Sequence, residues 1–140
     1  MSATSRNKGA GGERELANLL AGLTGWDVRR RVRQHDGDSD LEGVPGWSVE
    51  VKRHARAPRA SIAAWYAQSV SQAQVGGLLP VLFYRENRQP WRAVWPLSAL
   101  LTQQHTGMWT DYLWTADSSV EAWASAAVEL TIKGVAEADR

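Results

Sequence analysis

The chain has 140 residues, 44% of them hydrophobic, and this length and composition suit one globular domain with a single core. No segment approaches the roughly 18 apolar residues of a membrane-spanning helix, and the first twelve residues are polar and glycine-rich, unlike a secretory signal. We therefore expect a cytoplasmic protein with no membrane partner. Because cysteine is absent, disulfides and thiolate zinc sites are excluded, and any metal site should be oxygen-rich, which favours Mg²⁺ or Mn²⁺.

The net charge of +1 is unevenly distributed along the chain. Residues 1–96 carry 14 Lys/Arg against 9 Asp/Glu, whereas residues 97–140 carry 2 against 6. Arginines gather on both sides of an acidic segment: Arg29, Arg30, Arg31 and Arg33 precede it, and Arg53, Arg56 and Arg59 follow it. A basic rim around an acidic centre favours a protein that binds a phosphate backbone, although a solvated charged surface is the alternative.

The first half of the chain predicts a basic disordered arm, two helices and three strands. Residues 1–9 form the arm, and a leucine stripe predicts a helix over 11–23. A strand is expected over 26–33, followed by an acidic β-hairpin that ends near Arg53, and a second helix over 61–75.

The second half predicts strands over 78–84 and 91–95, so that the order becomes α-β-β-β-α-β-β, a mixed central β-sheet flanked by helices. For the tail we expect a short helix, a strand and a final helix over 97–104, 108–114 and 120–132. We predict a core domain over 1–96 and an acidic extension over 97–140 that packs on the same domain and is a candidate dimerisation surface.

The acidic hairpin carries the candidate chemistry. Side chains alternate along a strand, so Glu50 and Lys52 point to one face. A turn centred near Pro45 would place Asp40 opposite Glu50, with a Cβ separation of about 5 Å. Two carboxylates and an ammonium can hold a divalent cation and position a water, which is the chemistry of a metal-dependent phosphodiesterase. Because acidic residues alternate through this segment, Asp38 could replace Asp40 as the ligand.

Other polar residues have less specific patterns. Glu13 and Glu15 both flank the leucine stripe of the first helix, and helical geometry leans only slightly to Glu13. Gln68 and Gln72 either face the site as support or belong to a polar surface. The glycines before the first helix lack a preceding strand and a following Gly-Lys-Ser/Thr, so no nucleotide cofactor is expected.

Three motifs in order resemble the PD-(D/E)XK nuclease superfamily, and within it the archaeal-type Holliday junction resolvases and their phage-encoded relatives. These motifs are Lys8-Gly9-Ala10-Gly11-Gly12-Glu13-Arg14-Glu15-Leu16, Asp40-Leu41-x-Gly43 and Val49-Glu50-Val51-Lys52. The strands around Gly77–Leu82 and Trp91-Arg92 are also similar, so the resemblance covers about residues 6–96. Ser39 stands where the superfamily pattern has a proline before the aspartate.

The resemblance implies a restriction-endonuclease-like fold with Mg²⁺ or Mn²⁺ as cofactor. It implies metal ligation by Asp40 and Glu50, a contribution from Glu13, and a water-orienting role for Lys52. DNA contacts are expected from the basic residues around these motifs: Lys8, Arg14, Arg30, Arg31, Arg33, Arg53 and Arg56. The tryptophans are most simply core or dimer-interface anchors, with stacking on junction bases as the weaker alternative: Trp26, Trp65, Trp91 and Trp95.

We therefore expect a metal-dependent DNA endonuclease that hydrolyses phosphodiesters with a metal-bound water. The most specific reading is a homodimeric Holliday junction resolvase of phage or prophage type that acts on four-way junctions in the bacterial cytoplasm. A nuclease of the same fold that cuts linear, nicked or flap DNA in repair or restriction is the nearer alternative. A non-catalytic DNA-binding module with a degenerate site is the alternative of another class.

Overall fold

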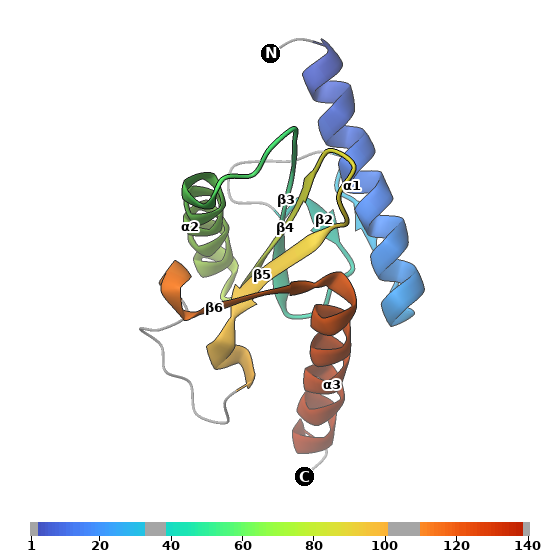
Figure 1. The fold of residues 1–140 in the computed structure, drawn as a ribbon. Coiled ribbons are helices and arrows are strands. Elements are labelled where there is room, and N and C mark those ends of the chain that lie inside the picture. The colour runs from blue at the N-terminus through green and yellow to red at the C-terminus, as the bar shows by residue number, and fades with distance from the viewer. Residues whose placement is uncertain (1–2, 33–38, 101–109, 139–140) are drawn as a thin grey trace.

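The computed structural model describes the backbone of residues 3–32, 39–100 and 110–138, and the side chains of these residues between 9 and 132. It has three layers, with a β-sheet between helices (Figure 1). Helix α2 (Arg59–Gly76) covers one face of the sheet, and α1 (Ala3–Thr24) and α3 (Val120–Ala138) cover the other. No helix in these described stretches is long and apolar enough to cross a membrane.

The central sheet has the strand order β3-β4-β5-β6. Strand β3 (Trp47–His54) runs parallel to β4 (Leu79–Glu86), which pairs antiparallel with β5 (Arg92–Pro96). Strand β6 (Thr115–Ser119) pairs antiparallel with β5. A short antiparallel ribbon of β1 (Arg29–Arg30) and β2 (Leu41–Glu42) lies beside the free edge of β3.

Strict alternation along the strands divides the apolar residues between two cores. Val81 and Phe83 of β4 belong to the core under α1 and α3, whereas Leu82 and Tyr84 belong to the core under α2. The first core centres on Trp123 of α3, which contacts Trp47 and Phe83 edge to face at 5.5 Å and 5.0 Å between ring centroids. On β3, Val49 packs in this core, so the neighbouring even-numbered residues face α2.

The predicted order α-β-β-β-α-β-β and the mixed sheet are confirmed. The disordered arm is wrong from residue 3 onward, because α1 already begins at Ala3. In the described part of the strand predicted over 26–33, residues 26–32, the strand is limited to Arg29–Arg30. It starts late because Thr24 Oγ1 accepts from the Trp26 N–H and the Val28 N–H bonds back to Trp26 O in a turn.

The tail also differs from its prediction. Over Tyr112–Trp114, where a strand was expected, the chain forms a 3₁₀ helix, η2, whose first turn is capped by the Asp111 side chain accepting from Leu113 N at 2.9 Å. Within the short helix predicted over 97–104, Leu97–Leu100 form a 3₁₀ helix, η1, and residues 101–104 lie outside the described residues. The tail adds β6 to the sheet and Trp123 to the core, while its status as a separate extension stays a prediction.

Gly43 fixes the approach of the β2–β3 connection to the segment before β1. Its φ of +89° lies in the left-handed region, and a Cβ there would come within 2.1 Å of Asp27 O. Gly46, four residues before Glu50, also has a positive φ, +83°, but a Cβ there would meet nothing within 4 Å. A comparison of substitutions at these two glycines therefore distinguishes the effect of backbone strain from the effect of a steric clash.

We predict that Gly43→Ala lowers the free energy of unfolding by about 3 kcal/mol or more, because it combines strain with a backbone clash. Gly46→Ala, which adds strain alone, should cost about 1 kcal/mol. Urea denaturation of the two variants and the wild type measures both losses. Equal losses would show that the contact with Asp27 does not constrain this turn.

Candidate active site

Glu50 and Lys52 of β3 point together toward α2. Glu50 is 4% exposed, and Lys52 Nζ lies 3.2 Å from Glu50 Oε1. A buried carboxylate held by a single ammonium results from the alternation of β3, because Val49 on the opposite face is fixed in the apolar core.

Asp40 reaches the same place from the segment that leads into β2. Its N–H donates to Val49 O at 2.8 Å, and its Oδ2 accepts from the Val51 N–H at 2.8 Å. These two bonds lie on either side of Glu50 along β3, so the structure brings Asp40 beside Glu50. We call these two residues the carboxylate pair. Asp38, the alternative ligand, lies outside the described residues.

Ser39 holds the segment that carries Asp40. Its Oγ accepts from the Val49 N–H at 2.9 Å and donates to Leu41 O at 2.6 Å, so it joins β3 to the start of β2. Sequence reasoning treated Ser39 only as a departure from a proline pattern. A hydroxyl directly before the aspartate was the available signal, since serine side chains readily bond to nearby backbone groups.

Burial and mutual repulsion make the carboxylate pair reluctant to ionise. Loss of solvent and the charge of Glu50 raise the pKa of Asp40, the bond from the Val51 N–H lowers it, and the net result is a pKa of about 7. Burial also raises the pKa of Glu50, while the ammonium of Lys52 lowers it. The net effect of these causes is to raise the pKa of both acids, in spite of the nearby Lys52.

Glu13 of α1 adds a third negative charge at this place. It raises the pKa values of Asp40 and Glu50, and its Oε2 accepts from Arg30 Nε at 2.7 Å. Glu15 is held elsewhere, where it accepts from Trp91 Nε1 at 2.8 Å and from Arg85. Of the two glutamates, the structure therefore turns Glu13 toward the carboxylate pair.

The donor set fits a hard divalent cation. Glu50 Oε2 is buried and has no hydrogen-bond partner among the residues that the structure describes. Mg²⁺ is commonly bound through one or two carboxylates, with waters and substrate phosphate filling its other positions. Among the described residues no three Asp, Glu or His side chains lie close enough to hold one ion together, and Glu13 is already paired with Arg30. Asp40 and Glu50 are therefore the side chains here whose chemistry suits such an ion, and Glu13 adds its negative charge nearby.

The two predicted glutamines of α2 occupy different positions. Gln72 is near enough for its side chain to bond to Glu50 and lower the pKa of that carboxyl. Gln68, one turn toward the start of α2, is exposed. The structure thus joins Gln72 to the carboxylate pair and leaves Gln68 at the surface.

The predicted DNA-binding arginines fall into two groups. Arg30 and Arg31 are engaged by the protein, since Arg30 pairs with Glu13 and Arg31 Nε donates to Ser39 O at 3.0 Å. Arg53 points to the α1 face, opposite Lys52, with its Nη1 3.9 Å from Glu15 Oε2. Arg14 on α1 and Arg56 after β3 are exposed. The Lys8 side chain and Arg33 lie outside the described residues.

Two comparisons with known proteins found similar molecules. A family model described as "Phage putative PDDEXK endonuclease" matches residues 4–121. The structure of Hjc from Archaeoglobus fulgidus, a Holliday junction resolvase from an archaeal hyperthermophile, matches with a TM-score of 0.53 and 18% identity, over 84% of this chain and 96% of that one. At this identity the likeness shows the restriction-endonuclease-like fold. A search of curated proteins found no match.

We predict that Asp40→Asn stabilises the metal-free protein at pH 8. A carboxyl whose folded pKa is raised contributes stability that is complete below the unfolded pKa of about 4 and is lost as the pH rises through about 7. The amide retains an acceptor for Val51 but carries no charge, so its advantage should grow from near zero at pH 4.5 to about 2–3 kcal/mol at pH 8.

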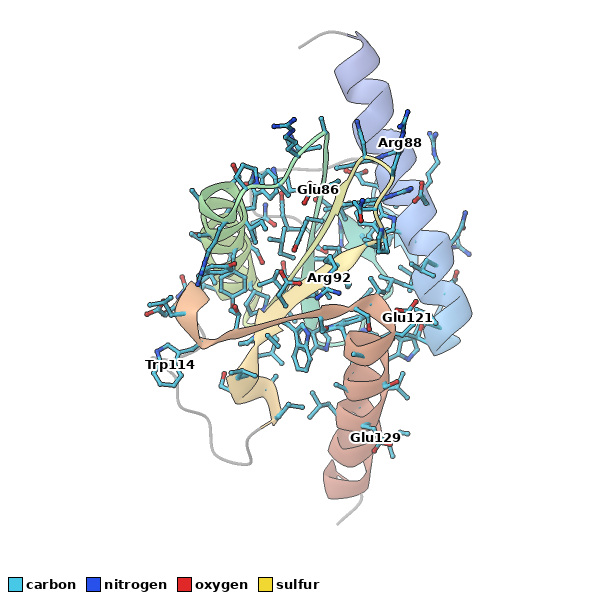
Figure 2. The ribbon with its side chains drawn as sticks, viewed as in Figure 1. Glu86, Arg88, Arg92, Trp114, Glu121 and Glu129 are labelled. Carbon is cyan, nitrogen blue, oxygen red and sulfur yellow. The ribbon has the colours of Figure 1, made fainter. Side chains whose placement is uncertain are left out.

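Urea denaturation in EDTA at the two pH values measures this difference. The matched control is Glu129→Gln on α3, an exposed glutamate labelled in Figure 2, whose effect should not change with pH. An Asp40→Asn protein that is equally destabilised at both values would show that Asp40 is not strained by ionisation.

Proposed function

Because the chain belongs to the phage PDDEXK endonuclease family, we propose that it is a divalent-metal-dependent DNA endonuclease acting at Asp40, Glu50 and Lys52. The observation that carries this assignment is the carboxylate pair itself. Two buried acids beside one ammonium, with Glu50 Oε2 lacking a described partner, destabilise the fold when they are ionised. Such an arrangement suits the binding of a cation.

The chain's own residues suit phosphodiester hydrolysis. Asp40 and Glu50 supply two negative charges on one side of the site, and beside them the Lys52 ammonium can donate hydrogen bonds. Bound Mg²⁺ or Mn²⁺ would supply polarisation of the scissile phosphate and a lower pKa for a coordinated water. Lys52 then orients the attacking water and stabilises the charge that develops on the phosphate, while the Val51 N–H holds Asp40 in place.

For the substrate, we propose DNA four-way junctions, cut in the bacterial cytoplasm by a protein of phage type. The support is the shared fold with a protein described as a Holliday junction resolvase, together with the exposed arginines Arg14 and Arg56. A nuclease of the same fold that cuts linear, nicked or flap DNA, and a non-catalytic DNA-binding module, are the alternatives that the cleavage experiment separates.

A two-fold junction is matched by a two-fold protein, so we also propose a homodimer. The register that pairs Pro96 with Thr115 places η1 and η2 at the same end of β5 and β6. Exposed apolar side chains gather on these two elements: Leu97, Leu100, Leu113 and Trp114. Figure 2 shows the labelled Trp114 at the left edge, projecting from η2 away from the sheet.

The dimer proposal predicts that Leu113→Lys shifts the protein toward monomer, because a charge would be buried in an apolar contact. Sedimentation velocity of the wild type, this variant and Val75→Lys, a change at an exposed apolar residue of α2, measures the effect. A wild type that stays monomeric at all concentrations contradicts the homodimer.

For catalysis, we predict nicking of DNA by the wild type with Mg²⁺ or Mn²⁺ and none with EDTA. Glu50→Gln and Lys52→Met should each reduce the cleavage rate at least about 100-fold, because each removes a charge that the transition state needs. The substrate panel contains a four-way junction, linear duplex, nicked duplex and a flap, and DNA binding is measured beside cleavage. Glu129→Gln is the matched control and should cut like the wild type.

The pattern of cleavage decides among the alternatives. Symmetric nicking of the junction alone supports a resolvase, whereas cutting of linear, nicked or flap DNA supports the other nuclease. If wild type and Glu50→Gln bind DNA equally and neither cuts any substrate with any metal, the enzyme assignment is wrong.

A further inference from the structure

His54 continues the row of side chains that begins with Glu50 and Lys52. It is two residues beyond Lys52 on β3, so alternation turns it to the same face of the strand, and it is exposed at the end of β3. Its ring stacks on Trp65 of α2, with 4.6 Å between centroids and 23° between planes. The imidazole is therefore held as a flat surface on the same face of β3 as Glu50 and Lys52.

Helix α2 lies along this face of β3 and is close to it near both Glu50 and His54. The Gln72 side chain lies near Glu50, and Trp65 stacks on His54. From Trp65 to Gln72 the helix rises about 10 Å, and from Glu50 to His54 the strand rises about 13 Å. The two lengths are similar, so α2 can contact β3 at both positions. The stacked rings thus lie about 13 Å from Glu50, within reach of nucleotides next to the scissile phosphate.

Trp65 fixes the histidine ring from behind. It is partly buried and packs against the apolar core under α2, which contains Ile62 and Tyr66. One ring face of His54 is covered by this indole, while the side chain as a whole remains exposed. A ring that is already immobilised loses little further freedom when a flat ligand stacks on it.

The charges around His54 suit a base better than a phosphate. The β3–β4 register places Glu86 directly beside His54, and Figure 2 shows Glu86 labelled on the upper part of β4, between α2 and α1. A carboxylate at this position disfavours a phosphate there. Arg56, exposed two residues further along, offers a cation for the backbone of the same strand.

We propose that His54, backed by Trp65, stacks on a DNA base that is unpaired or splayed from its helix next to the cut. The inference rests on the proposed endonuclease function and narrows its substrate to DNA with a branch, flap or single-stranded end near the scissile bond. Aromatic side chains, histidine included, bind unstacked bases in this way, whereas a base inside continuous duplex offers no free face.

The test distinguishes stacking by the His54 ring from a contact made by the charge of the side chain. Dissociation constants for branched DNA and for continuous duplex are measured in EDTA with full-length protein, so that binding is independent of cleavage. His54→Ala should weaken binding of branched DNA by roughly 5- to 100-fold, which is the usual effect of removing a stacking platform, and should leave duplex binding unchanged. His54→Phe keeps the ring and should bind within about threefold of the wild type, whereas His54→Lys should resemble the alanine variant.

A second measurement locates the base. An abasic site is placed at each nucleotide around the cut in turn, and the dissociation constant is measured for each DNA. An abasic site at one of these positions should weaken binding by the wild type and should not change binding by His54→Ala or Trp65→Leu. The control is Val75→Ala, a change at an exposed apolar residue of α2 outside the proposed dimer surface, and thermal midpoints establish that each variant is folded. If Trp65→Leu fails to fold, the His54 variants still test the proposal, because His54 is exposed.

Rescue by lysine and not by phenylalanine would overturn the stacking role in favour of a phosphate contact. Equal binding by His54→Ala and the wild type would overturn any role in DNA binding. In either case wild-type cleavage with Mg²⁺ would leave the endonuclease assignment intact, whereas a wild type that cuts nothing refutes that assignment separately.

Discussion

The structure around the site depends on one unfavourable arrangement, the burial of Asp40 and Glu50 side by side, with Lys52 paired to Glu50. Solvent loss and like charge raise the pKa of both acids, so the fold is strained wherever both are ionised. Under the proposed function, a hard cation bound between the two acids would remove that strain. The backbone bonds on either side of Glu50 and the hydroxyl of Ser39 hold the arrangement in place.

The alternation of β3 connects this site to the rest of the molecule. Val49 is fixed in the core under α1 and α3, which forces Glu50, Lys52 and His54 to face α2. Helix α2 lies along that face and contributes Gln72 near one end and Trp65 near the other. The proposed catalytic charges and the proposed stacking surface for a base therefore both follow from one strand whose other face is packed in the core.

The sequence predicted those features that depend on short-range periodicity. The element order and the meeting of Asp40 with Glu50 followed from alternation and a glycine turn. Choosing between Glu13 and Glu15 needed tertiary structure, because their different partners, Arg30 and Trp91, lie 17 and 76 residues away. The His54–Trp65 contact joins two elements and has no local signal, while η2 replaced a strand because a side-chain cap competed with extended backbone.

The central claim is that the carboxylate pair is a cation site, and Mn²⁺ binding in the absence of DNA tests it most directly. Calorimetric titration should show binding by the wild type and by Glu129→Gln, and at least tenfold weaker binding by Asp40→Asn and Glu50→Gln. Affinity should rise as the pH increases through about 7, because Asp40 must lose its proton to bind metal. Binding that is unchanged in both carboxylate variants would contradict the account.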